Sequence, residues 1–137
     1  VLFRSSVMTA NTLAGQISGP KDLFGRVVGV LDGGAGDRYC AVHDIQVVRF
    51  SNLKDAVDGL LSHRVDALIA DAASLESFDL AHPELPITEI GELFERRHFG
   101  FPVNPRNPEL LKTVNVGLLQ VRESGILDHV RGEWFTR

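Results

Sequence analysis

A glycine-rich turn is the first feature of this sequence whose residues could do chemistry. It reads Asp32, Gly33, Gly34, Ala35, Gly36, after a run of β-branched residues and before a stretch that can be helical. A turn from a strand into a helix directs backbone N–H groups and the positive end of the helix dipole at one place, which suits an anion. A tight turn that needs glycine only for its backbone angles is an equally good interpretation.

Nucleotide binding is weakly supported at this turn. A phosphate-binding loop needs a lysine followed by Ser or Thr, and Asp37 and Arg38 occupy that region. A dinucleotide-binding turn needs a third glycine and an acidic residue at the end of the next strand, where Tyr39, Phe50 and Ser51 stand instead.

Asp71 is the second candidate, directly after the apolar run 67–70. The C-terminal ends of parallel strands border the crevice where ligands bind, so a carboxylate there could meet a ligand ammonium group. Asp is also a favoured N-cap, and Ala72 and Ala73 can begin a helix. From the residues alone the cap is the stronger interpretation, and one Asp can do both.

Catalytic and metal-binding patterns are sparse. Cys40, the one cysteine, is three residues before His43 on the apolar side of a short predicted helix, which favours a small buried side chain over a nucleophile. The five histidines are scattered, and no Cys/His spacing is typical of zinc. We therefore expect no catalytic residue, no metal and no cofactor.

Composition describes a chain that can bury a core. Among 137 residues, 44% are hydrophobic and 23% charged, which argues against disorder, and the length suits one ordinary domain. The net charge is −4 with no basic block, which argues against nucleic-acid partners. No apolar run approaches the roughly 20 residues of a membrane-spanning helix.

The N-terminal residues look unlike the rest. We interpret residues 1–5 (Val-Leu-Phe-Arg-Ser) as a sequencing or cloning scar outside the fold. Residues 6–22 are small, polar and interrupted by Ser18, Gly19 and Pro20, which predicts a connector and not a core strand.

Beyond the connector, strand and helix patterns alternate. We predict strands over residues 27–31, 45–50, 66–70, 87–93 and 99–103, and helices over 35–42, 53–61, 72–80, 109–123 and 126–135. This alternation predicts an α/β fold with a mainly parallel sheet flanked by helices.

Several motifs in order resemble one known family. They are residues 22–30, the glycine turn, residues 60–67 with Asp71, and the chain end from Val114 to Phe135. Together they resemble the second half of a type 2 periplasmic binding protein, namely the amino-acid-binding proteins of ABC importers (solute-binding family 3) and the ligand-binding core of ionotropic glutamate receptors.

The resemblance implies a fold of two α/β lobes that close on a ligand. Residues 23–97 would form lobe 2, and residues 98–137 a hinge crossing and two C-terminal helices that return to a first lobe absent from this chain. Asp71 matches the acidic residue that binds the ligand's α-ammonium group. Gly34, Ala35 and Gly36 cover positions that hold a carboxylate, usually with Ser or Thr hydroxyls that this sequence lacks.

The same resemblance leaves two kinds of parent protein. Thr9, Ala10, Asn11, Thr12 and Leu13 resemble the stretch where the last pore helix of a glutamate-receptor-type channel leaves the membrane. We therefore expect a prokaryotic, potassium-conducting channel, a membrane-bound homotetramer whose binding domain faces the periplasm or the outside. The alternative is a periplasmic importer protein, in which an extended hinge strand enters at this point.

Two further classes share the fold. They are a dehydratase-type enzyme, which needs a general acid or base in the cleft, and the effector lobe of a transcription regulator, which needs an upstream helix-turn-helix.

Overall fold

The computed structural model describes residues 2–98 and 100–135. The chain divides into two compact units, one ending at residue 99 and one beginning at Gly100. Each unit is described by itself.

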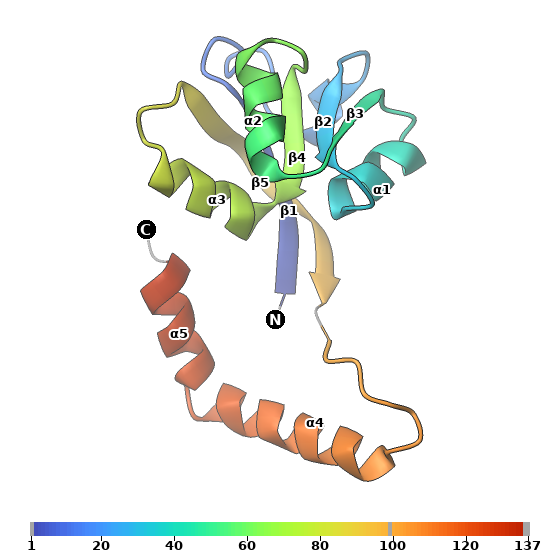
Figure 1. The fold of residues 1–137 in the computed structure, drawn as a ribbon. Helices are drawn as coiled ribbons and strands as arrows, with labels where there is room; N and C mark the ends of the chain where they lie inside the picture. Colours follow the sequence, from blue (N-terminus) through green and yellow to red (C-terminus); the bar gives the residue numbers. More distant parts are fainter. Residues whose placement is uncertain (1, 99, 136–137) are drawn as a thin grey trace. The chain divides into compact units, whose positions relative to one another are not determined.

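The first unit is built on one five-stranded sheet in the order β3-β2-β4-β1-β5 (Figure 1). Its strands and helices are β1 Leu2–Ala10, the 3₁₀ helix η1 Pro20–Leu23, β2 Val28–Leu31, α1 Ala35–Val42, β3 Val47–Phe50, α2 Leu53–Leu61, β4 Ala67–Asp71, α3 Ala72–Ala81 and β5 Ile87–His98. Strand β2 pairs in parallel with β3 and β4, whereas β1 pairs antiparallel with β4 and β5. The α/β fold is confirmed, and the sheet is mixed, with its parallel part limited to β3, β2 and β4.

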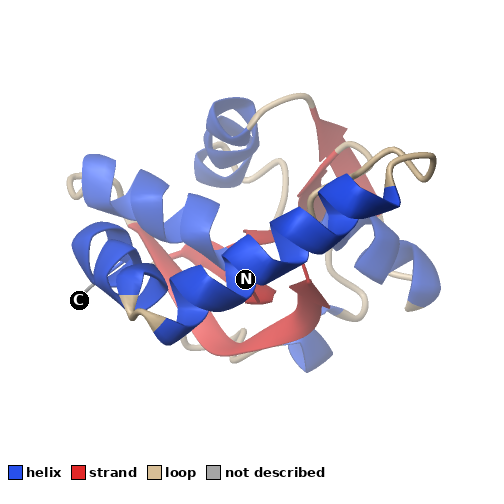
Figure 2. Cartoon of the chain, turned by 90° about the horizontal axis from the view of Figure 1, so that it is seen from below, coloured by secondary structure: helices blue, strands red, loops and turns tan. Residues whose placement is uncertain are grey.

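Helices cover both faces of this sheet (Figure 2). On one face, α2 and α3 pack residues such as Val57, Leu60 and Leu75 against Met8 and Leu68. The opposite face holds a second apolar cluster, in which α1 and η1 contribute Cys40 and Leu23 against Val7, Val30 and Ile69. Strand residues alternate between the two clusters because successive side chains point to opposite faces.

The prediction of a connector without a core strand over residues 6–22 is wrong for residues 6–10. They belong to β1, which lies between β4 and β5 and is buried from Ser5 to Ala10. Small polar residues are tolerated there because they fit between the layers, and the Thr9 hydroxyl donates to the Asp66 carbonyl at 2.9 Å. Residues 2–5, set aside as a scar, form the beginning of the same strand.

The strand predicted at 99–103 is also absent over residues 100–103, and Phe99 lies outside the described residues. Strand β5 instead runs without interruption from Ile87 to His98. Its pairing with β1 continues, with two register shifts, to Leu2–His98, so hydrogen bonding extends the strand past Leu93, where the apolar pattern stops.

The second unit contains two helices, α4 Pro108–Glu123 and α5 Ile126–Phe135, as predicted. Asn107 caps α4 by accepting a hydrogen bond from the Leu110 amide at 3.0 Å. Gly125, with φ of 75°, separates the two helices. No residue of α4 is buried. None of the described helices is long and apolar enough to cross a membrane.

Candidate functional site

The predicted site residues lie together at one edge of the sheet. Gly34, Ala35, Gly36 and Asp71 all line one pocket of about 430 Å³. The parallel arrangement of β2 and β4 causes this, because both strands end at that edge and α1 and α3 begin there.

The glycine turn is shaped by backbone contacts that only glycine permits. Gly33 has φ of +64°. A Cβ on Gly36 would lie 2.6 Å from the Ile69 carbonyl oxygen of β4, so α1 begins in close contact with the strand. The turn is therefore required by packing, whether or not it also binds an anion.

The first turn of α1 presents unused amides. The first hydrogen bond of this helix runs from the Arg38 amide to the Gly34 carbonyl at 3.3 Å. No hydrogen bond among the described residues uses the amides of Ala35, Gly36 or Asp37. Orphan amides at a helix N-terminus are suitable donors for a carboxylate.

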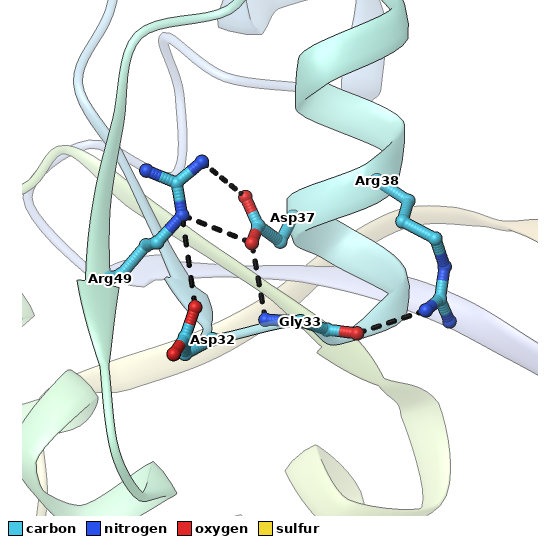
Figure 3. A network of polar contacts seen from close by, with 5 residues as sticks. All are labelled: Asp32, Gly33, Asp37, Arg38 and Arg49. Carbon is cyan, nitrogen blue, oxygen red and sulfur yellow. Dashed lines mark hydrogen bonds and ion pairs between the residues drawn. The ribbon is translucent and has the colours of Figure 1, made fainter.

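A charged network holds this turn in place (Figure 3). Arg49 of β3 reaches Asp37 of α1, with Nε to Oδ2 at 3.0 Å and Nη2 to Oδ1 at 2.9 Å, and lies 3.9 Å from Asp32. Asp37 Oδ2 also accepts from the Gly33 amide at 3.1 Å. The hydrogen bond from Arg49 lowers the pKa of Asp37, although partial burial opposes it. Sequence patterns miss this network because its members come from different elements.

Asp71 acts as the N-cap of α3. Its Oδ1 accepts a hydrogen bond from the Ser74 amide at 3.0 Å, as the cap interpretation predicts. Among the described residues no other hydrogen bond uses the Asp71 side chain, so Oδ2 can accept from a ligand in the adjoining pocket. The cap thus orients a carboxylate that retains accepting capacity.

Five polar residues of the pocket were not predicted. They are Arg4, Ser5, Arg38, Ser74 and Glu95. Ser74 could have been found from its spacing after the Asp71 cap. Arg4 and Ser5 were missed because residues 1–5 were set aside. No local sequence signal distinguishes Glu95.

Cys40 lies away from solvent in the second apolar cluster. Burial raises the pKa of its thiol to about 11, so the group stays protonated at neutral pH. Within the described residues, no group of three or more His, Cys, Asp or Glu side chains is arranged to hold a metal ion.

Curated relatives of this chain are amino-acid-binding proteins. The L-arginine-binding protein of Pseudomonas aeruginosa is 28% identical over 132 residues, which cover 88% of this chain and 51% of that protein. The ABC transporter arginine-binding protein 1 of Escherichia coli is 24% identical over 121 residues, covering 83% and 49%. This chain therefore spans about half the length of the curated relatives it matches. No family model matches the chain.

Solved structures share the whole fold. A mutant of ArgBP from T. maritima aligns with a TM-score of 0.84 and 25% identity, over 100% of this chain and 59% of that one. The chain has the α/β fold of a type 2 periplasmic-binding-protein lobe. The ligand-binding core of GluR0, in complex with L-glutamate, has the same fold, with a TM-score of 0.92, 20% identity and coverage of 99% and 61%.

The pocket lies at the edge where the first turns of α1 and α3 meet the strand ends, and it is open to solvent on this unit. Both named curated relatives are arginine-binding proteins by name.

Proposed function

We propose that this chain supplies lobe 2 of a domain that binds an amino acid or a similar small zwitterion. The observation that carries the proposal is the pocket shared by Asp71 and the first turn of α1. A carboxylate and a set of unpaired amides on one pocket wall match the ammonium and carboxylate groups of a zwitterion.

Each group has a distinct role in this proposal. Asp71 Oδ2 accepts from the ligand ammonium, and the amides of Ala35 and Gly36 donate to the ligand carboxylate. Because no hydroxyl stands at positions 34–36, backbone N–H groups are the donors of this turn. The arginine-binding relatives support an amino acid as the ligand class.

The proposed domain boundaries follow the same family. Residues 2–98, which build the five-stranded sheet and its helices, are lobe 2 and not residues 23–97 alone, and the chain from Gly100 crosses a hinge and returns to lobe 1. The exposed apolar side chains of the α4–α5 unit support a docking role, because such residues are usually covered. On α4 they are Leu110, Leu111, Val116, Leu118, Leu119 and Val121.

Closure of the lobes on the ligand is the proposed mechanism. Lobe 2 supplies hydrogen-bond donors and an acceptor on one side of the zwitterion. Lobe 1 completes the site from the other side. Ligand contacts that exist only in the closed state shift the population toward it. A transporter would then recognise the closed domain, or closure would gate a channel.

Strand β1 bears on the choice between these two parents. It is an extended strand that pairs on both sides and leads through residues 11–19 into η1 and β2. An extended strand entering lobe 2 at this point is the feature of importer proteins, and it supports a periplasmic ABC importer component. Thr9 and Ala10 are buried strand residues here, which weakens their resemblance to the exit of a pore helix.

A glutamate-receptor-type channel is the second candidate. The observations that favour it are the Thr-Ala-Asn stretch from Thr9 to Asn11 and the shared fold of the GluR0 core. Both candidates place the domain in the periplasm or outside the cell. The upstream reading frame tests them: two apolar helices around a pore loop support the channel, and a signal peptide before a bare lobe 1 supports the importer.

Calorimetry on the full-length protein tests the binding site itself. Asp71→Asn keeps a capping oxygen but removes the charge, and we expect affinity for the bound amino acid to fall at least about 100-fold, as for a broken buried charge pair. Asp58→Asn is a matched control, because Asp58 is exposed on α2, where it pairs with Lys54 at 2.8 Å, and does not line this pocket. Unchanged affinity in Asp71→Asn would overturn the assigned role.

A further inference from the structure

Glu95 adopts an unusual backbone conformation inside a strand. Its φ is +51°, in the left-handed region, although it belongs to β5. The pairing of β5 with β1 shifts there: Phe3 faces Arg97 and Ser5 faces Phe94, so two residues of β5 lie opposite Arg4. This arrangement is a β-bulge, and bulges commonly redirect a side chain next to a binding site.

A glutamate is a costly choice at this position. Left-handed backbone is easily adopted by glycine, whereas a side chain with a Cβ is strained in it. Strained residues of this kind persist where the side chain is needed, and they concentrate at functional sites. The side chain of Glu95 therefore has a role that glycine could not supply.

The bulge places Glu95 in the pocket that contains Asp71. The pKa of Tyr39, on α1, is raised chiefly by burial, then by Cys40 and then by the charge of Glu95. Glu95 thus lines the same pocket as Asp71 and the first turn of α1.

Two arginine side chains partly offset the negative charge of this pocket. Arg38 lines the pocket and donates from Nη1 to the Gly33 carbonyl at 2.9 Å, beside the amides proposed for the ligand carboxylate. Arg4 lines the pocket opposite the bulge. The two arginines offset the negative charges that Glu95 and Asp71 bring to this pocket.

We propose that Glu95 is a specificity-determining residue of the amino-acid site. It accepts hydrogen bonds from a ligand side chain that carries donors, such as a guanidinium, ammonium or amide group, and it disfavours a side chain that ends in a carboxylate. This inference rests on the proposed function of the pocket.

Calorimetry with L-arginine, L-glutamine and L-glutamate on the full-length protein provides the test. The wild type is expected to bind arginine or glutamine at least about tenfold more tightly than glutamate, a ratio that one charge-assisted hydrogen bond can supply. Glu95→Gln and Glu95→Gly are expected to reduce that ratio about tenfold. Glu92→Gln is the control, since Glu92 is exposed on the same strand outside this pocket.

Thermal unfolding separates specificity from a structural role. Glu95→Gly relieves the left-handed strain, so its Tm is expected to equal or exceed that of the wild type while discrimination is lost. A lowered Tm with all three affinities reduced equally would overturn the proposal, as would an unchanged ratio in both variants. A wild type that binds none of the three amino acids would contradict the proposed function itself.

Discussion

Ser5 of β1 lies directly opposite Asp71 of β4 in an antiparallel ladder, and both residues line the candidate pocket. Antiparallel neighbours run in opposite directions, so the beginning of β1 reaches the same sheet edge as the end of β4. The N-terminal residues of this chain therefore form one wall of the site.

Strand β1 is expected to be integral to the fold. Val7 has 0% exposure in the second apolar cluster, and Val7→Ala should lower the free energy of unfolding by about 2 kcal/mol through lost burial and the cavity left behind. Val42→Ala is the matched control, because Val42 is 81% exposed and should change stability by less than about 0.5 kcal/mol. Chemical denaturation of both variants measures the difference, and equal losses would contradict the placement of β1.

Gly36 is expected to tolerate no side chain. In Gly36→Ala the new Cβ meets the Ile69 carbonyl oxygen at 2.6 Å, so α1 must move away from β4. We expect a loss of about 1–3 kcal/mol in unfolding free energy, as for overpacked cores. Gly15→Ala, where no heavy atom lies within 4 Å, should be close to neutral in the same denaturation experiment. A stable Gly36→Ala protein would show that the contact is not tight.

The cap at Asp71 has a stability component that is separable from binding. Asp71→Ala removes the acceptor of the Ser74 amide and should cost about 1 kcal/mol, whereas Asp71→Asn should cost little, because Asn caps about as well. Asn52→Ala removes the equivalent cap of α2, where Asn52 accepts from the Asp55 amide at 2.9 Å, and should lose similar stability without affecting binding. Similar losses for Asp71→Ala and Asp71→Asn would argue against the capping role.

The Asp37–Arg49 pair predicts an acid-sensitive turn. Because Arg49 lowers the pKa of Asp37 below its usual value of 3.8 in the folded chain, the pair's contribution is complete above that value. It is lost as the pH falls through 3.8 toward the lowered pKa. In Arg49→Gln, NMR titration should show the pKa of Asp37 moving up, and the stability loss between neutral and acidic pH should shrink.

Lys54→Gln supplies the comparison for that experiment. Lys54 pairs with Asp58 on the exposed face of α2. It is not among the residues that shift the pKa of Asp37. The titration of Asp37 should be the same in Lys54→Gln as in the wild type. A pKa of Asp37 that does not respond to Arg49→Gln would remove Arg49 as its cause.

The Cys40 thiol is expected to be unreactive in the folded chain. With its pKa raised to about 11 by burial, almost no thiolate exists at pH 8, and no solvent path reaches the sulfur at 0% exposure. Labelling with a thiol-specific disulfide reagent should be slow in buffer and fast in denaturant. Rapid labelling of the native protein would show that α1 opens locally.

Local patterns predicted much of this fold correctly. The β-branched run 27–31 became β2, and the spacing of Leu53, Val57 and Leu60 became the buried side of α2. These features were readable because a strand or helix repeats its contacts at fixed intervals along the chain. The end of β5 was misjudged because its last residues are held by pairing with β1 and not by an apolar pattern.

The sequence by itself determined the element types, the glycine turn and the cap at Asp71, because each depends on residues a few positions apart. Only the tertiary structure decided that β1 is a central strand, that Ser5 and Arg4 border the pocket, and that a bulge brings Glu95 there. The physical reason is that strand neighbours and register depend on hydrogen bonds between distant segments. Thr9, which looks like part of a connector in isolation, is stable in the core because its hydroxyl donates to the Asp66 carbonyl of a distant segment.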